Sequence, residues 1–178
     1  MSKNTPARYH PMQVGLHWLI VVLVFAAFII GKTMSDLPND LGKIASLAIH
    51  MTLGTITLIV LVARFIARFR LPRPAPATTG SAFLDWLGKV IHYALYALVF
   101  LMTVSGMSLS MQAGLLPIVF GGSSAALPAN FYAFNARMLH GFVAPALLLL
   151  VVLHVGAALY HQFLLKDNLL ARMWFDKK

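Results

Sequence analysis

Four long apolar runs constrain this chain more than any other feature of its sequence, because each run is long enough to cross a lipid bilayer. A membrane-spanning helix needs about 20 consecutive, mainly apolar residues. The runs cover residues 12–31, 41–68, 83–111 and 134–165, and only 11% of all residues are charged, against about 25% in a soluble domain. The sequence therefore predicts an all-α fold, an integral membrane four-helix bundle that forms a single domain over residues 1–178.

Polar and helix-breaking segments separate the four runs. The segment from Arg70 to Gly80 holds three prolines, which exclude a continuous helix there. Residues 112–130 contain several glycines and serines and are predicted to form the longest loop. The first run lacks a small-residue cleavage site, so we expect a retained helix and not a signal peptide.

Lysine and arginine are distributed unevenly between the two sides of the predicted bundle. Eleven of the fourteen lie in the two terminal tails or in and around the second loop, whereas Lys32, Lys43 and Arg137 lie on the opposite side. Because basic residues are enriched on the cytoplasmic side of membrane proteins, this distribution predicts a multi-pass protein of the bacterial inner membrane with both termini in the cytoplasm. It also accounts for the net charge of +9 without a nucleic-acid partner, since the basic residues border the lipid bilayer.

Away from the ends of the predicted spans, where ionisable residues are costly and usually functional, almost all of the ionisable residues are histidines. A proton relay would be expected to contain buried carboxylates, but all five acidic residues lie at or near helix ends. Imidazole without carboxylate instead suits a metal ligand. Because the chain has no cysteine, thiolate ligands and covalent haem attachment are excluded, and a haem here would be held by axial side chains alone.

The histidines fall at two depths in the predicted bundle. His140 and His154 are fourteen residues apart, which on a helix gives about 21 Å of rise and a rotation that returns to within about 40° of the same face. His50 is the one candidate at the level of His140. His154 can pair with His17 or His92, and we prefer His17 because it lies one turn into an apolar span. These pairs predict two non-covalent haem b groups with bis-histidine ligation.

The remaining candidates near these pairs have weaker signals. We expect His92 to pack beside the inner haem without binding its iron, and we interpret His10 as part of the N-terminal tail. His161 is an interfacial residue by default, with a role at a quinone site as the alternative. Glycines beside the histidines would let a flat macrocycle approach the backbone; they are Gly15, Gly54, Gly141 and Gly156.

Short motifs around the histidines are the most specific feature of the sequence. GLHWLI surrounds His17, AIHMTLG surrounds His50, and the third run reads IHYALYALVFLMTVSGM. The last run combines MLHG at His140 with VLHVGAALYHQFLLKDNLLARMW from Val152 onward. With these motifs, the chain resembles the bacterial cytochrome b561 family of small four-helix dihaem proteins along essentially its whole length.

This resemblance implies that His17 and His154 bind the iron of a cytoplasmic-side haem, and that His50 and His140 bind the iron of a periplasmic-side haem. Stand-alone members of this size are similar to superoxide oxidases, which take electrons from periplasmic superoxide and reduce ubiquinone in the membrane. Related b-type subunits instead serve hydrogenases and formate dehydrogenases as electron conduits. The sequence itself requires no protein partner.

The resemblance also gives the basic residues of the predicted periplasmic side a role. Superoxide is an anion, and we expect Lys43 and Arg137, together with Lys32, to attract it. Arg137 lies one helical turn from His140, so binding a haem propionate is an equal alternative for its guanidinium.

Quinone reduction needs protons, and the candidates on the cytoplasmic side are His161, Lys166 and His92, with Asp167 beside them in the sequence. Three alternative functions stay open. The chain could oxidise quinol and reduce a periplasmic acceptor, it could be the conduit subunit of a separate dehydrogenase or hydrogenase, or it could be a haemless four-helix transporter.

Overall fold

The computed structural model describes residues 6–175, and within them the chain folds only into helices, turns and loops. Four helices are long and apolar enough to span a membrane: α1 (Pro11–Ser35), α2 (Leu41–Arg70), α3 (Ala82–Gln112) and α5 (Asn135–Leu159), which continues as a π-helical segment, η2 (Tyr160–Leu165). Three short helical segments complete the fold: α4 (Leu115–Val119), η1 (Phe131–Ala133) and η3 (Leu169–Met173). The predicted all-α, four-helix membrane fold is confirmed.

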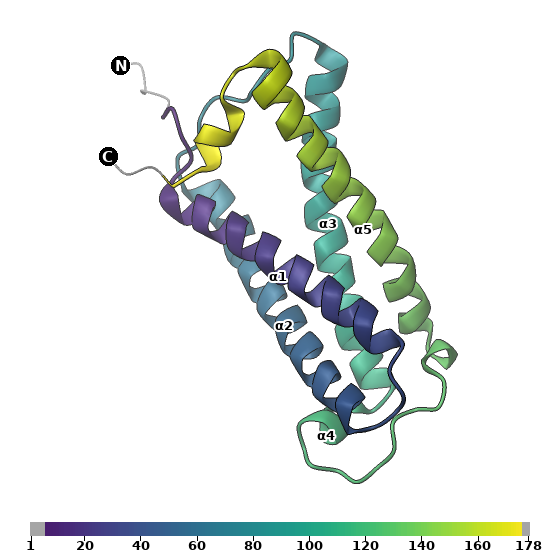
Figure 1. The fold of residues 1–178 in the computed structure, drawn as a ribbon. Helices are drawn as coiled ribbons and strands as arrows, with labels where there is room; N and C mark the ends of the chain where they lie inside the picture. The colour runs from purple at the N-terminus through teal and green to yellow at the C-terminus, as the bar shows by residue number, and fades with distance from the viewer. Residues whose placement is uncertain (1–5, 176–178) are drawn as a thin grey trace.

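The four long helices pack as two antiparallel pairs. The main contacts join α1 to α2 and α3 to α5, and Figure 1 shows the two pairs diverging toward the end of the bundle where α1 begins and α5 ends. We call this end the terminal end and the opposite one the α4 end. Midway along the bundle, buried Leu61, Val99 and Leu147 join the two pairs in one apolar cluster.

Side chains near the helix ends account for where α1 and α2 stop and start. Asp40 caps α2, because its Oδ1 accepts hydrogen bonds from Gly42 N at 2.9 Å and Lys43 N at 3.2 Å. The helix α1 runs four residues past its predicted end at Gly31. Polar residues of that extra turn hydrogen-bond to the helix itself, as Thr33 Oγ1 does to the carbonyl oxygen of Ile29 at 3.1 Å.

The segment 112–130 is not the plain loop that the sequence predicted, because it contains the short helix α4. Leu115 of this helix is 2% exposed and packs with Leu47, Ala113 and Leu127 in a second apolar cluster. Burial of this leucine against the end of the bundle explains why a helical turn forms although Gly114 precedes it and Pro117 lies within it. The segment therefore covers the α4 end.

The C-terminal segment (residues 166–175) crosses from the end of α5 back to the start of α1 (Figure 1). Trp18 Nε1 donates a hydrogen bond to the carbonyl oxygen of Met173 at 2.8 Å, and the Trp18 and Trp174 rings lie 5.6 Å apart. Tyr9 N donates to the Arg172 carbonyl oxygen at 3.2 Å. The segment thus links the two helix pairs at the end where they diverge.

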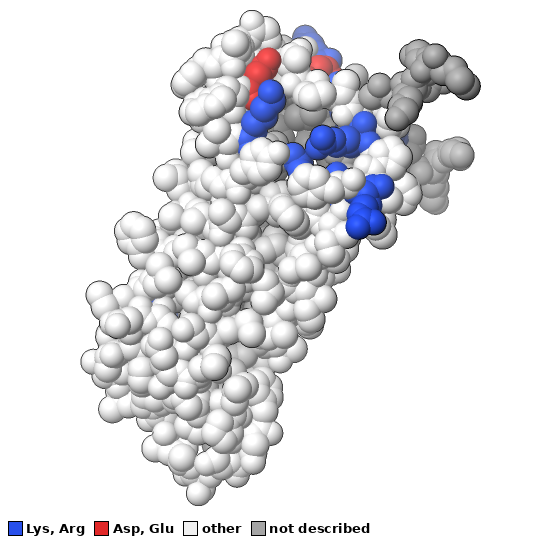
Figure 2. All heavy atoms as spheres, turned by 180° about the vertical axis from the view of Figure 1, so that it is seen from behind, with Lys and Arg blue, Asp and Glu red and all other residues white. Residues whose placement is uncertain are grey.

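The surface of the bundle is apolar along most of its length. Large apolar side chains such as Phe25, Ile59 and Leu149 are exposed in the middle of the long helices, as expected for side chains that contact lipid. On the face drawn in Figure 2, lysine and arginine gather at the terminal end, and the rest of that face carries neither basic nor acidic groups. Asp176, one of the five acidic residues, lies outside the described residues.

Candidate functional site

Two imidazoles face each other across the bundle near the α4 end. His50 of α2 and His140 of α5 have ring centres 6.1 Å apart, with planes at 80°. The Nδ1 atom of His50 lies 3.0 Å from the carbonyl oxygen of Ala27, and the Nδ1 atom of His140 lies 3.0 Å from Ser105 Oγ. A carbonyl oxygen can only accept, so His50 Nδ1 is the donor and Nε2 keeps the lone pair that a metal would bind.

A second pair of imidazoles nearer the terminal end repeats this geometry. His17 of α1 and His154 of α5 have ring centres 6.2 Å apart, with planes at 75°. His92 of α3 also lies against His154, with ring centres 5.0 Å apart. Its Nδ1 atom is 2.6 Å from the carbonyl oxygen of Gly88. The structure therefore brings both sequence candidates, His17 and His92, to the same partner, but at different distances.

The separations of these rings can be compared with those of metal-bound imidazoles. Two imidazoles on opposite sides of one metal ion, each with a metal–nitrogen distance of about 2 Å, have ring centres about 6 Å apart. The pairs at 6.1 Å and 6.2 Å fit this arrangement, whereas His92 and His154 at 5.0 Å are too close for it. Within the described part of the chain, no group of three or more histidines and acidic residues is arranged to hold a bare metal ion. Two axial imidazoles therefore fit a metal whose other ligands come from a macrocycle.

A cavity of about 1370 Å³ lies between the helix pairs and contains the His50–His140 pair. Ser110 also lines it, and the Ser110 Oγ atom is buried without a hydrogen-bond partner among the described residues. Gly54, one turn after His50, borders the cavity, and a Cβ atom added there would meet no atom within 4 Å. Open space beside the backbone and an unpartnered buried hydroxyl both fit a large bound group.

Two glycines that the sequence reasoning missed make room for the imidazoles themselves. A Cβ atom on Gly31 of α1 would lie 2.9 Å from His50 Cε1, and a Cβ atom on Gly106 of α3 would lie 3.1 Å from His140 Cε1. Neither glycine is near its histidine in the sequence, so only the packing of α1 on α2 and of α3 on α5 reveals the contact. Of the four predicted glycines, Gly15, Gly54 and Gly156 face open space, and Gly141 lies against Arg137 Nη1.

The three predicted cations of the α4 end share the cavity that holds His50 and His140. Lys32, Lys43 and Arg137 all line it. The Arg137 guanidinium lies 4.9 Å over the ring of Tyr132, and Lys43 Nζ donates a hydrogen bond to the Leu37 carbonyl oxygen at 2.8 Å. The structure thus places positive charge on the wall of the cavity.

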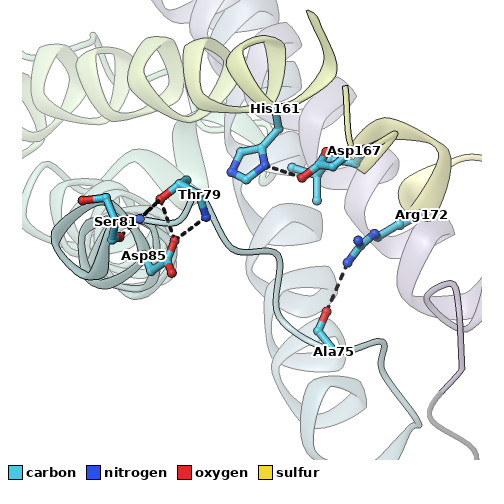
Figure 3. A network of polar contacts seen from close by, with 8 residues as sticks. Ala75, Thr79, Ser81, Asp85, His161, Asp167 and Arg172 are labelled. Atoms are coloured by element: carbon cyan, nitrogen blue, oxygen red, sulfur yellow. Dashed lines mark hydrogen bonds and ion pairs between the residues drawn. The ribbon is translucent and has the colours of Figure 1, made fainter. Parts of the chain in front are cut away.

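At the terminal end, the side chains predicted to supply protons for quinone reduction lie in two separate places. His161 Nδ1 and Asp167 Oδ2 are 2.6 Å apart, and the ring points toward this carboxylate (Figure 3). Lys166 has a left-handed backbone (φ 55°) and is exposed in the turn that brings Asp167 back to His161. His92, by contrast, lies against His154.

Comparison with known proteins agrees with this arrangement. A family profile described as Prokaryotic cytochrome b561 matches residues 8–176. The chain is 32% identical over 174 residues to cytochrome b561 homolog 2 of Escherichia coli, with 96% of this chain and 93% of the relative covered. It is 31% identical over 170 residues to cytochrome b562 of Cereibacter sphaeroides, with 93% and 94% covered.

A third relative carries a more specific name. The chain is 29% identical over 173 residues to a probable superoxide oxidase of Yersinia pestis, with 96% of this chain and 98% of the relative covered. The family profile and these relatives span nearly the whole chain, including all four long helices and both histidine pairs. The chain therefore belongs to the prokaryotic cytochrome b561 family and is a multi-pass bacterial membrane cytochrome that binds haem b and transfers electrons.

Proposed function

We propose that this cytochrome takes electrons from superoxide at the α4 end and delivers them to ubiquinone at the terminal end. The observation that supports this most directly is the repeated imidazole pair, at 6.1 Å and at 6.2 Å. We assign His50 and His140 as axial ligands of one haem b and His17 and His154 as those of a second. When bound, each haem supplies one-electron redox chemistry at its iron.

The spacing of the two pairs suits transfer across a membrane. The fourteen residues between His140 and His154 correspond to about 21 Å along α5, against a hydrocarbon core of about 30 Å. We propose that the terminal end lies in the cytoplasm and that the membrane is the bacterial inner membrane. The gathering of basic residues at that end supports this orientation (Figure 2).

The proposed donor is recognised by its charge. Lys32, Lys43 and Arg137 line the cavity that contains the His50–His140 pair, and a cleft lined by cations raises the local concentration of a small anion. Asp36 lies 3.9 Å from Lys32, but both side chains are mostly exposed, so solvent screens this pair. The name of the relative from Yersinia pestis supports the same donor.

The proposed reaction balances in electrons and protons. Two superoxide anions each lose one electron and leave as dioxygen, and one ubiquinone gains two electrons and two protons to become ubiquinol. The oxidation of superoxide needs no proton, whereas the reduction of quinone needs a group that holds and passes protons. We propose that His161, hydrogen-bonded to Asp167, does this, with Lys166 and His92 as further proton-side groups.

Rapid mixing tests this function on the purified protein loaded with two haems. Superoxide is expected to reduce the haems, seen as an increase in their reduced absorbance bands, and added ubiquinone is expected to reoxidise them. Superoxide dismutase in the mixture is the control and should abolish the reduction. A fully loaded protein that superoxide fails to reduce contradicts the proposal, and a dehydrogenase or hydrogenase that co-purifies would then support the role of a conduit subunit.

Removal of positive charge from the cavity wall should slow the reaction with superoxide. We expect the double variant Lys43→Gln and Arg137→Gln to lower the second-order rate constant by about tenfold and to weaken its dependence on ionic strength. Lys89→Gln, an exposed lysine at the other end of the bundle, is the matched control. A change in the haem reduction potential with an unchanged rate constant would instead indicate that Arg137 binds a propionate.

Loss of the His161–Asp167 pair should affect the quinone step alone. We expect His161→Gln to slow reoxidation by ubiquinone by roughly 100-fold, the lower end of a general acid's usual contribution, with reduction by superoxide unchanged. Asp167→Asn keeps an acceptor for the imidazole and should have a smaller effect, together with a shifted pH profile. Unchanged reoxidation in both variants would remove His161 from the proposed site.

A further inference from the structure

The terminal half of α2 carries two arginines, Arg64 and Arg68, whose depth along the helix can be compared with that of the histidines. Helices α2 and α5 both run from the α4 end to the terminal end (Figure 1), and His50 and His140 face each other across them. Fourteen residues further along, α5 presents His154 and α2 presents Arg64. This step is about 21 Å and returns to within about 40° of the same helix face. Arg64 therefore lies on α2 at the level of His154, which belongs to the second histidine pair.

The contacts of Arg64 agree with this placement. Arg64 contacts α1 one helical turn before His17, a member of the second pair. Its Nη1 atom donates a hydrogen bond to the carbonyl oxygen of Gln13 at 2.7 Å, which fixes the guanidinium against α1. Tyr96 of α3 contacts the same guanidinium. Arg64 thus lies inside the bundle beside the second imidazole pair and not in the lipid-facing rim.

Arg68 lies one helical turn further toward the terminal end, on the same side of α2. Its guanidinium carbon lies 5.3 Å over the ring of Tyr93, the residue that follows His92 on α3. The Arg68 Nε atom is buried and has no hydrogen-bond partner among the described residues. A buried donor of this kind is normally paired in a folded protein, so its partner is expected to be a bound group.

No carboxylate of the described chain balances these two charges. Within residues 6–175, ion pairs join Lys32 to Asp36 and His161 to Asp167, and neither pair involves Arg64 or Arg68. Unpaired charge inside a membrane protein is costly and generally marks a binding function. Haem b carries two propionate carboxylates, and the guanidinium group matches a carboxylate with two parallel hydrogen bonds.

We propose that Arg64 and Arg68 bind the propionates of the haem held by His17 and His154, and that their charge makes this haem easier to reduce. The proposal rests on the haem ligation proposed above. Reduction adds one electron to the haem, so a nearby positive charge stabilises the reduced form. Arg64 and Arg68 would therefore raise the reduction potential of the terminal-end haem, which favours the arrival of electrons there.

Redox titration of the purified full-length protein tests this inference without a measurement of superoxide or quinone turnover. Arg64→Gln and Arg68→Gln are each expected to lower the reduction potential of one haem. The expected shift is a tenfold change in its reduction equilibrium constant, which corresponds to about 59 mV for one electron. The potential of the other haem should stay the same. The resonance Raman band of propionate bending should also shift in these variants. Arg70→Gln, an exposed arginine at the end of α2, is the matched control and should change neither signal.

A second set of variants separates propionate binding from a structural role. Arg64 also contacts Gln13, so Arg64→Lys, which keeps the charge, should restore most of the potential if the effect is electrostatic. Arg68→Gln leaves that contact intact. Unchanged potentials and an unchanged propionate band in folded, two-haem Arg64→Gln and Arg68→Gln proteins would overturn the inference. A wild-type protein with fewer than two haems would instead overturn the proposed ligation, so the two failures are distinguishable.

Discussion

Replacement of His140 by alanine is expected to yield a folded protein with one haem instead of two. His140 and His50 face each other at 6.1 Å, and no other imidazole of the described chain is paired with either of them at such a distance. Loss of one axial ligand leaves the iron of that haem with a single protein ligand, whereas the His17–His154 pair stays intact. The haem-to-protein ratio, measured as the pyridine haemochrome, should therefore fall by half.

The control for this change is Ser105→Ala, which removes only the hydroxyl 3.0 Å from His140 Nδ1. We expect this variant to keep both haems, because the imidazole itself remains. His50→Ala should reproduce the half-loading of His140→Ala. Two haems in folded His140→Ala, or loss of both haems from a monodisperse preparation, would contradict the proposed ligation.

The second large effect concerns the choice between His17 and His92. Replacement of His154 or His17 by alanine should remove the terminal-end haem, whereas His92→Ala should keep two haems per chain. The physical reason is that His92 lies 5.0 Å from His154, too close for an iron between the rings, whereas His17 lies 6.2 Å away. Haem loading and the electron paramagnetic resonance signals of the two ferric haems measure this difference. Loss of one haem from His92→Ala with full loading of His17→Ala would reverse the assignment.

Much of this arrangement could be predicted from the sequence, because the spacing of residues along a membrane-spanning helix gives the depth of each residue in the membrane. The fourteen residues between His140 and His154 fix both a distance and a common face, and the histidines on the other spans then have few partners at each level. The four-helix membrane fold followed in the same way from the four apolar runs, and it is confirmed. The haem ligation itself remains a proposal.

Other features could not be predicted, because they depend on which helix faces meet. Gly31 and Gly106 each lie against a histidine of another helix, and their local sequence resembles that of any glycine in a membrane span. In the sequence, Arg64 and Arg68 look like any basic residues near the cytoplasmic end of a membrane span. The helix α4 was missed because its stability comes from burial of Leu115 against the bundle, a tertiary contact that the surrounding glycines and serines gave no reason to expect.

One imidazole of each facing pair belongs to the same continuous helix, α5. Small movements of the four helices relative to one another can change the distance between the two imidazoles of a pair. They hardly change the distance between His140 and His154, because the backbone hydrogen bonds of one helix hold it. Pro145 lies between the two histidines without ending the helix. Because the rate of electron tunnelling depends steeply on distance, the proposed transfer between two haems at these levels would be little affected by motions of the surrounding lipid.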